Sequence, residues 1–136
     1  MTDQPSRSWP LVEVDASALP VLEAQRSITG SLQAAIERGE PFVAVVHMPA
    51  AGPRERRLAG VADRIRMLKR LRPGLSARCL GLAFVVSAEA QRQNAKAIRS
   101  ADKLWGCPTR AVDDPTTARA WALAQLHGSD TATGDA

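Results

Sequence analysis

The segment between Pro41 and Pro49 constrains the fold more than any other part of the sequence. Between these prolines, Phe42–Met48 forms an apolar run that only His47 interrupts, and three of its residues are valine. Valine is β-branched and favours strands. A strand without alternating polar residues is typical of the centre of a parallel sheet, where helices cover both faces. The run therefore predicts an α/β fold.

Three further segments have strand patterns. Leu80–Val86 is a second apolar run, whereas Leu11–Asp15 alternates apolar and polar residues and indicates a half-buried strand. Thr109–Val112 is a short fourth strand. Helical patterns separate these segments, and strands that alternate with helices predict parallel pairing. The predicted fold class is therefore α/β, a single domain with a four-stranded, mostly parallel sheet and helices on both faces.

Apolar residues that recur at helical spacing predict the intervening helices. Gly39 suits the C-cap of the first helix, and Ser87 suits the N-cap of the third. Either Asp113 or Asp114 is expected to cap the fourth. The segment Arg72–Gly74, with its central proline, is expected to end the second helix. The predicted helices span Pro20–Arg38, Arg54–Leu71, Ala88–Leu104 and Pro115–Leu126.

The bulk properties fit one small domain. The chain has 136 residues, 45% of them hydrophobic and 24% charged, which is enough to build a single core. We expect the domain to span residues 9–127, with disordered segments at 1–8 and 128–136. The polar start predicts no secretory signal, and no apolar run has the length of a membrane span. Two cysteines without a disulfide framework favour a cytoplasmic location.

Several stretches together have the pattern of a known family. Phe42–Met48, then an arginine-rich loop into a long helix, is followed by Arg78–Val86. Near the end, Ala111–Asp114 leads into Thr117–Ala122 as a last strand and an Ala/Trp helix. This order resembles the SpoIIAA-like proteins, relatives of STAS domains and of CRAL-TRIO-type lipid-binding domains. The resemblance implies a four-stranded α/β sheet with helices packed on it.

For function, the resemblance implies little by itself, and the expectation of a regulatory module that binds another protein comes from the better-known STAS relatives. STAS relatives are phosphorylation-controlled partners of regulatory proteins, and their phosphorylated serine lies in an Asp-Ser-Ser-Gly-like turn at a helix start. This chain has no such turn, and Ser87–Glu89 occupies a similar place after a strand without the motif. The resemblance therefore carries over the binding role but not the phosphorylation switch.

His47 is the first candidate for chemistry. It stands at the carboxyl end of the apolar strand, where open α/β sheets place ligand crevices, and histidine titrates near neutral pH. One interpretation makes it an acid/base group or a ligand contact. The other makes it a structural residue, hydrogen-bonded to a neighbouring carbonyl. Trp105, at a helix end near the same edge, is expected to line that pocket or to form a homodimer contact.

The stretch Arg54–Arg78 has the strongest charge bias, with nine cations against two anions. The predicted helix presents Arg66 and Arg70 on its polar side, where they are expected to bind a protein partner. The alternatives are an anionic lipid headgroup and a solvated face that only maintains solubility. Nucleic acid is not expected, because the sequence has no binding motif and its aromatic residues are three Trp, two Phe and no Tyr.

The arginines that precede this helix form a second candidate set. If Arg54, Arg56 and Arg57 lie at the mouth of a crevice beside His47, they can hold a phosphate or carboxylate group in a bidentate manner. This set would make the protein a binder of an anionic small molecule or lipid. An enzyme in the same crevice, with His47 as acid/base, is the less favoured version of the same hypothesis.

The remaining motifs argue against cofactor chemistry. Cys79 precedes a buried strand and is expected in the core, whereas Cys107, between Gly106 and Pro108, is expected to be exposed. Two cysteines and two histidines as scattered single positions do not predict a zinc site. No glycine-rich phosphate loop is present. No cofactor and no metal site are therefore predicted.

Two classes of function remain open, with a clear distinction between them. The favoured hypothesis is a non-catalytic regulatory or interaction module of the SpoIIAA-like type, which binds a protein through an arginine-rich helix face. The alternative is a small-molecule or lipid-binding protein that uses the crevice at the carboxyl end of the sheet. The first predicts that binding tolerates His47→Ala and is lost when Arg66 and Arg70 are changed; the second predicts the reverse.

Overall fold

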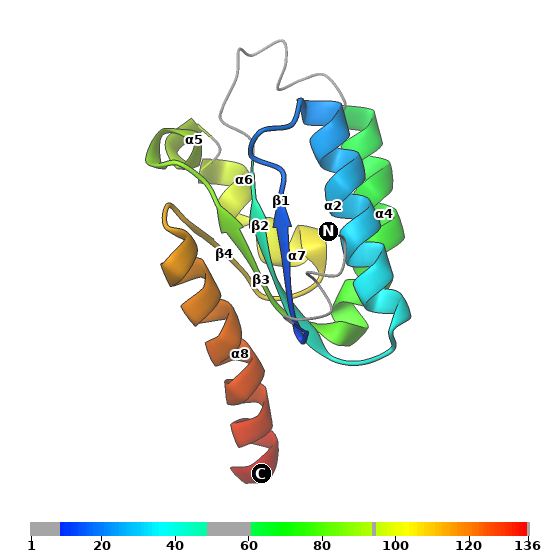
Figure 1. Ribbon diagram of the computed structural model, residues 1–136, viewed down its shortest axis with the longest axis vertical. Coiled ribbons are helices and arrows are strands. Elements are labelled where there is room, and N and C mark those ends of the chain that lie inside the picture. Colours follow the sequence, from blue (N-terminus) through cyan, green and yellow to red (C-terminus); the bar gives the residue numbers. More distant parts are fainter. Residues whose placement is uncertain (1–8, 49–60, 94, 136) are drawn as a thin grey trace.

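The computed structural model describes residues 9–48, 61–93 and 95–135, and it confirms the predicted α/β class. One four-stranded sheet, parallel throughout, is packed between helices in a three-layer arrangement (Figure 1). Strands and helices follow each other along the chain in the order β1 Leu11–Asp15, α2 Val21–Glu37, β2 Phe42–His47, α4 Val61–Arg78, β3 Cys79–Val85, α5 Ala88–Gln93, α6 Ala95–Arg99, α7 Ala101–Trp105, β4 Thr109–Val112 and α8 Pro115–Asp135.

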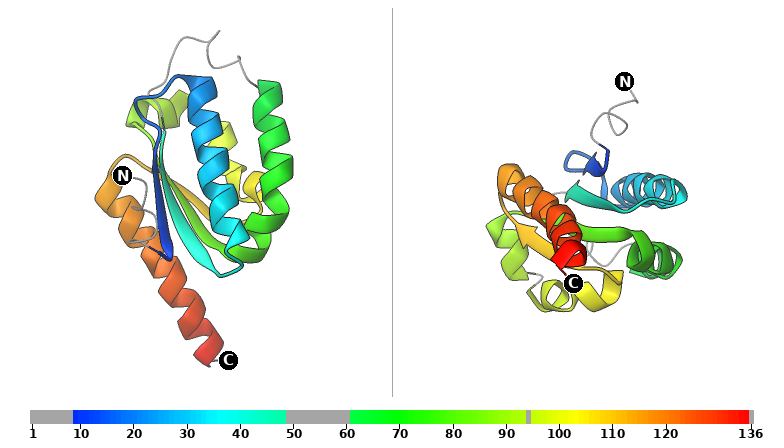
Figure 2. Two further views of the ribbon diagram at one scale, coloured as in Figure 1. Left: turned by 45° about the vertical axis from the view of Figure 1, so that its right-hand side comes forward. Right: turned by 90° about the horizontal axis from the view of Figure 1, so that it is seen from below.

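The strand order explains which helices cover which face. The strands lie side by side as β1-β2-β3-β4, each parallel to the next. Crossovers between parallel strands are right-handed, so connections that always step in the same direction place their helices on the same face. Helices α2, α4 and α7 accordingly lie on one face of the sheet (Figure 2). Helix α8 lies on the other face and packs against the second core.

Strand β2 is buried on both faces, as its apolar run predicts. Phe42–Val46 are 0% exposed. Phe42, Ala44 and Val46 belong to the core beneath α2 and α4, whereas Val43 and Val45 belong to the core beneath α8. Because side chains alternate along a strand, His47 projects to the α8 side. This alternation decides which residues can reach the histidine.

A glycine and a helix cap fix the position of α8. A Cβ on Gly81 of β3 would lie 2.8 Å from Cγ of Gln125, so the glycine lets α8 approach the sheet closely. At its start, the Thr117 amide donates a hydrogen bond of 2.7 Å to Oδ2 of Asp114. Asp114 is therefore the N-cap, with Pro115 in the first helical position where a missing N–H costs nothing.

Helix α4 continues where the sequence predicted its end. It runs through Pro73 to Arg78, although a proline inside a helix costs about 3 kcal/mol. Tertiary packing offsets that cost, because Leu71 and Leu75 are both 0% exposed. Gly74 also lets α2 approach, since a Cβ there would lie 2.5 Å from Cγ2 of Ile36. The expected end at Arg72–Gly74 is wrong, and the predicted helical residues 54–60 lie outside the described residues.

The predicted single helix Ala88–Leu104 is wrong as well. Three short helices, α5, α6 and α7, replace it, and Ser100 before α7 has φ −98° and ψ 3°. Ser87 does cap the first of them, because the Ala90 amide donates a hydrogen bond of 3.1 Å to its hydroxyl oxygen. In the described part of this segment, two residues have less than a tenth of their surface exposed. Both are alanines, Ala90 and Ala101. Such a thin apolar stripe does not stabilise one long helix.

The two ends of the chain differ in what the structure describes. Helix α8 passes Leu126, where its predicted end lay, and continues to Asp135. The segment 1–8, predicted to be disordered, lies outside the described residues. Among the helices that the structure describes, none has the length and apolarity that crossing a membrane requires.

Candidate functional site

His47 takes part in a charged contact at the carboxyl ends of β1 and β2. Its Nε2 atom lies 2.6 Å from Oε2 of Glu13. Glu13 projects to the same face because its neighbours Val12 and Val14 face the opposite core. The partner is a carboxylate from the adjacent strand, so the histidine is structurally engaged, although not through the carbonyl that the sequence interpretation expected.

Arg119 of α8 completes this contact. It donates two hydrogen bonds to Glu13, from Nε to Oε1 at 3.0 Å and from Nη2 to Oε2 at 2.9 Å. A planar guanidinium fork matches both carboxylate oxygens, which makes this pairing stronger than a single-point ion pair. We call Glu13, His47 and Arg119 the Glu13 network. It joins the first strand, the second strand and the last helix of the described chain.

The network shifts the ionisation of its members. The hydrogen bonds from Arg119 lower the pKa of Glu13 below its usual value, His47 acts in the same direction, and partial burial opposes both. The hydrogen bond to Glu13 in turn raises the pKa of Arg119. The side chains of His47, Glu13 and Arg119 are 15%, 28% and 43% exposed. Glu13 therefore stays ionised, and both of its oxygens are used within the fold.

Chemically, the Glu13 network is better suited to structure than to catalysis. Nε2 of His47 is directed at Glu13, and Glu13 is neutralised by Arg119, so the carboxylate has no oxygen left over to activate a substrate. The neighbouring Asp15 is also engaged, since it accepts a hydrogen bond of 2.6 Å from the Ser17 hydroxyl. Within the described ranges, no cluster of three or more His, Cys, Asp or Glu side chains is arranged to hold a metal ion.

The other residues predicted for the His47 crevice do not join it. Trp105 packs against Phe84, with ring centroids 5.3 Å apart, on the face that α2 and α4 cover. It is therefore separated from His47 by the sheet, because the crossover before β4 lies on the face opposite α8. The arginines at positions 54, 56 and 57 lie outside the described residues. The expected grouping of Trp105 with His47 is not what the structure shows.

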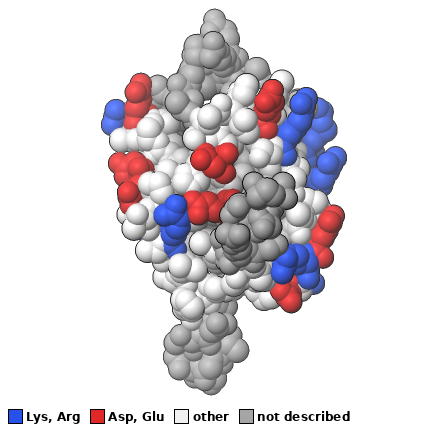
Figure 3. Space-filling model, viewed as in Figure 1, with Lys and Arg blue, Asp and Glu red and all other residues white. Residues whose placement is uncertain are grey.

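The other predicted surface is present on α4. Arg66, Lys69 and Arg70 are exposed, and their i, i+3, i+4 spacing places them on one side of the helix. We call these three residues the basic face. Residues 65–78 contain no acidic side chain, and no carboxylate in the described part of the chain pairs with Lys69 or Arg70. Figure 3 shows Lys and Arg side chains gathered on the flank where α2 and α4 lie.

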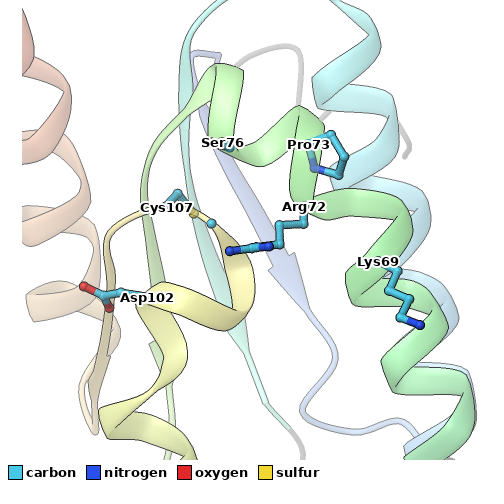
Figure 4. A pocket seen from close by; sticks show the side chains of 7 residues that line it. Lys69, Arg72, Pro73, Ser76, Asp102 and Cys107 are labelled. Carbon is cyan, nitrogen blue, oxygen red and sulfur yellow. The ribbon is translucent and has the colours of Figure 1, made fainter.

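A cavity of about 650 Å³ lies beside the basic face, between α4 and α7. Its lining includes Lys69, Arg72, Asp102 and Cys107. Arg72 reaches across toward Cys107, whereas Asp102 turns toward β4 (Figure 4). There Asp102 accepts hydrogen bonds from the backbone and hydroxyl groups of Thr109. Sequence reasoning missed this cavity, because its two walls are far apart in the sequence and no local pattern links them.

The two cysteines also differ from expectation. Cys79 is in the core, as predicted, with 4% of its surface exposed. Cys107 was expected to be exposed, but it is 5% exposed. Gly106, in the left-handed conformation with φ 82°, ends α7 and turns the chain inward, so the next residue enters the core.

Comparison with known proteins identifies no relative of this chain. The resemblance to SpoIIAA-like proteins stays a prediction from the order of elements and the residues quoted above. No protein-family model matches the chain, and no significant match is found among curated proteins or solved structures.

Proposed function

We propose that this protein is a non-catalytic interaction module of the SpoIIAA-like type, which binds an acidic protein surface through the basic face of α4. The observation that supports the proposal is the arrangement of Arg66, Lys69 and Arg70 on one exposed side of a helix. The same helix has no acidic side chain between residues 65 and 78. A partner that supplies carboxylates would pair with Lys69 and Arg70, which have no carboxylate partner in the described part of the chain.

The energetics of the basic face favour a role in binding. Arg66 and Arg70 are four residues apart, and like charges at that spacing destabilise a helix by about 0.2–0.5 kcal/mol. The pairing of these two arginines with each other therefore does not stabilise the helix. Guanidinium groups bind carboxylates in a bidentate manner, and a one-signed patch increases the rate of encounter with an oppositely charged protein.

The shape of the basic face favours a protein over the other anionic partners. The cations follow the exposed side of a helix, and successive turns are about 5.4 Å apart, a spacing that suits carboxylates displayed on a helix or strand. Base stacking would require exposed rings. Trp105 and Trp121 instead pack within the two cores.

A labelled peptide rich in Asp and Glu provides the test. We expect its binding, followed by fluorescence anisotropy, to weaken at least tenfold when Arg66→Gln, Lys69→Gln and Arg70→Gln are combined. A matched control combines Arg92→Gln, Lys96→Gln and Arg99→Gln. It removes the same charge from exposed positions on α5 and α6 and should bind nearly as the wild type does.

The result that overturns the proposal is equally clear. Equal losses in both variants would show that only net charge matters, and an unchanged affinity of the α4 variant would exclude the basic face. His47→Ala should leave peptide binding unchanged, because His47 lies at the contact between β1, β2 and α8 rather than on α4. Rising salt should weaken the wild-type complex, since screening acts within about 10 Å at 0.1 M salt.

A second candidate is the binding of a small anion in the cavity between α4 and α7. The orientation of Arg72 into that cavity favours it (Figure 4). Titration with inorganic phosphate, followed by amide NMR signals, should then shift Gly106 and Cys107. Arg72→Gln should abolish these shifts, and Arg78→Gln, at the exposed end of the same helix, should preserve them. Shifts that survive Arg72→Gln would exclude this candidate.

A further inference from the structure

Two cysteines that are distant in the sequence meet at the amino end of β3. Cys79 is the first residue of β3, and Cys107 lies in the turn between α7 and β4. Both belong to the core beneath α2 and α4. Cys79 is the group that acts most strongly on the Cys107 thiol, which makes the two side chains neighbours, and the Cys79 thiol donates a hydrogen bond of 3.4 Å to the carbonyl oxygen of Gly81. They therefore form a contacting pair of free thiols.

Irregular backbone at two places creates this pair. Phe42 pairs with Cys79 and Val43 with Gly81, so Leu80 is an extra residue in β3, which turns toward the core beneath α8. The bulge leaves Cys79 on the face opposite to Leu80. On the other side, Gly106 ends α7 in the left-handed conformation and returns the chain to the sheet.

Small molecules can approach this buried pair. Both cysteines line a cavity of about 400 Å³ at this end of the sheet. Cys107 also lines the neighbouring cavity of about 650 Å³, beside Arg72. A peroxide is small enough to enter such openings, whereas a protein thiol or a bulky reagent is not. Because only small molecules reach the two thiols, a disulfide between Cys79 and Cys107 is favoured over a disulfide with another chain.

We propose that Cys79 and Cys107 form a reversible intramolecular disulfide when the protein meets a peroxide. The Cys79 sulfur attacks one oxygen of hydrogen peroxide; the O–O bond breaks, the thiol proton and the departing hydroxyl group leave together as one water, and Cys79 becomes a sulfenic acid. The Cys107 sulfur then attacks the Cys79 sulfur. The S–S bond forms, the S–O bond breaks, and a second water leaves. The two thiols lose two electrons, and the peroxide gains them.

The order of these steps follows from the environment of Cys107. The neighbouring Cys79 raises the pKa of the Cys107 thiol, and burial and the charge of Asp102 act in the same direction. Cys107 therefore retains its proton while Cys79 reacts. The roles differ accordingly: Cys79 is the residue that meets the peroxide, and Cys107 is the residue that resolves the sulfenic acid.

Mass spectrometry of the full chain tests the proposal. After treatment with equimolar hydrogen peroxide, we expect the intact mass to fall by two hydrogens and digestion to yield a peptide joining Cys79 to Cys107. Dithiothreitol should reverse both changes. Because the bond closes a long loop of the unfolded chain, the Tm of the oxidised monomer should rise by roughly 10 °C.

Single variants separate the two roles. In Cys107→Ala, oxidised Cys79 should remain a sulfenic acid that dimedone traps, whereas in Cys79→Ala, Cys107 should stay unmodified. Circular dichroism establishes that each variant is folded before it is oxidised. The proposal is overturned if the wild type, under conditions that oxidise a cysteine-containing peptide, keeps both thiols free, forms only disulfide-linked dimers, or accumulates sulfinic acid instead of the internal bond.

Discussion

The Glu13 network and the basic face are both rich in charge, and they differ in how that charge is satisfied. In the network, Arg119 and His47 each contact a carboxylate from another element of the fold. On the basic face, cations stand beside one another on a single helix without an acidic residue in between. The difference teaches that the net charge of +4 is a poor guide to function, whereas the pairing of each charge is informative.

The two regions also differ in what they stabilise. The Glu13 network joins β1, β2 and α8, so its hydrogen bonds restrain elements that are distant in the sequence. It is partly buried, and charge-assisted hydrogen bonds of this kind contribute more than exposed ion pairs do. On the basic face, Lys69 and Arg70 are exposed, and neither pairs with a carboxylate in the described part of the chain. Removing a charge from the Glu13 network should therefore lower the stability of the fold, whereas removing one from the basic face should weaken binding.

The largest effect on stability is expected for Glu13→Ala. It leaves Arg119 and His47 without their shared partner, and we expect the free energy of unfolding to fall by about 2–3 kcal/mol. Urea denaturation followed by tryptophan fluorescence measures the change. A double-mutant cycle with Arg119→Ala should give a coupling energy of about 1 kcal/mol or more. A coupling energy near zero would remove the distinction between the two regions.

A smaller effect is expected from pH. The pKa of Glu13 is lower in the folded protein than its usual value of 4.5, so its contribution to stability is complete above that pH and is lost as the pH falls through the folded-state pKa. The stability gap between wild type and Glu13→Gln should therefore narrow on acidification from pH 7 to pH 3. Asp15 and Asp114 also have lowered pKa values, but both proteins keep them, so they cancel in the difference. A constant gap would contradict the assignment.

The smallest effect on stability is expected on the basic face. Arg70→Gln should change the free energy of unfolding by less than about 0.5 kcal/mol, because an exposed cation is removed from beside other cations. Arg119→Gln, the matched change in the Glu13 network, should cost about 1–2 kcal/mol. Thermal unfolding of both variants, side by side, provides the measurement. Equal losses of stability would show that the basic face is structural as well.

The sequence predicts the fold where local pattern and packing agree. Strand β2 and the N-cap at Asp114 can be predicted from the sequence, because each depends on residues that are neighbours in the chain. Helix α4 escapes prediction at Pro73, because the burial of Leu75 against the rest of the core overrides a local signal. Secondary-structure propensity describes the conformation that a segment prefers in isolation. Where the folded protein adopts another conformation, as at Pro73, tertiary packing is the cause.

The candidate site is harder to predict, for a related reason. Arg66 and Arg70 are found from helical spacing, which is a local property. Glu13 and Arg119 are 106 residues apart, and nothing in their surroundings in the sequence marks them as partners. The cysteine pair depends on a strand bulge and a helix end that no periodicity reveals. Contacts of this kind follow from the register of the sheet, which must be known first.

The position of α8, on the face of the sheet opposite α2, α4 and α7, has a consequence for how this part of the fold forms during synthesis. Each strand is added at the same edge of the growing sheet, next to the strand made just before it. The face beneath α8 stays open to solvent through all of these additions. When α8 emerges, Arg119 reaches back to Glu13 on the first strand, so the last helix both covers the apolar surface and secures the earliest part of the sheet. Until then, the nascent chain exposes the apolar surface that α8 later covers, and exposed surface of this kind promotes aggregation.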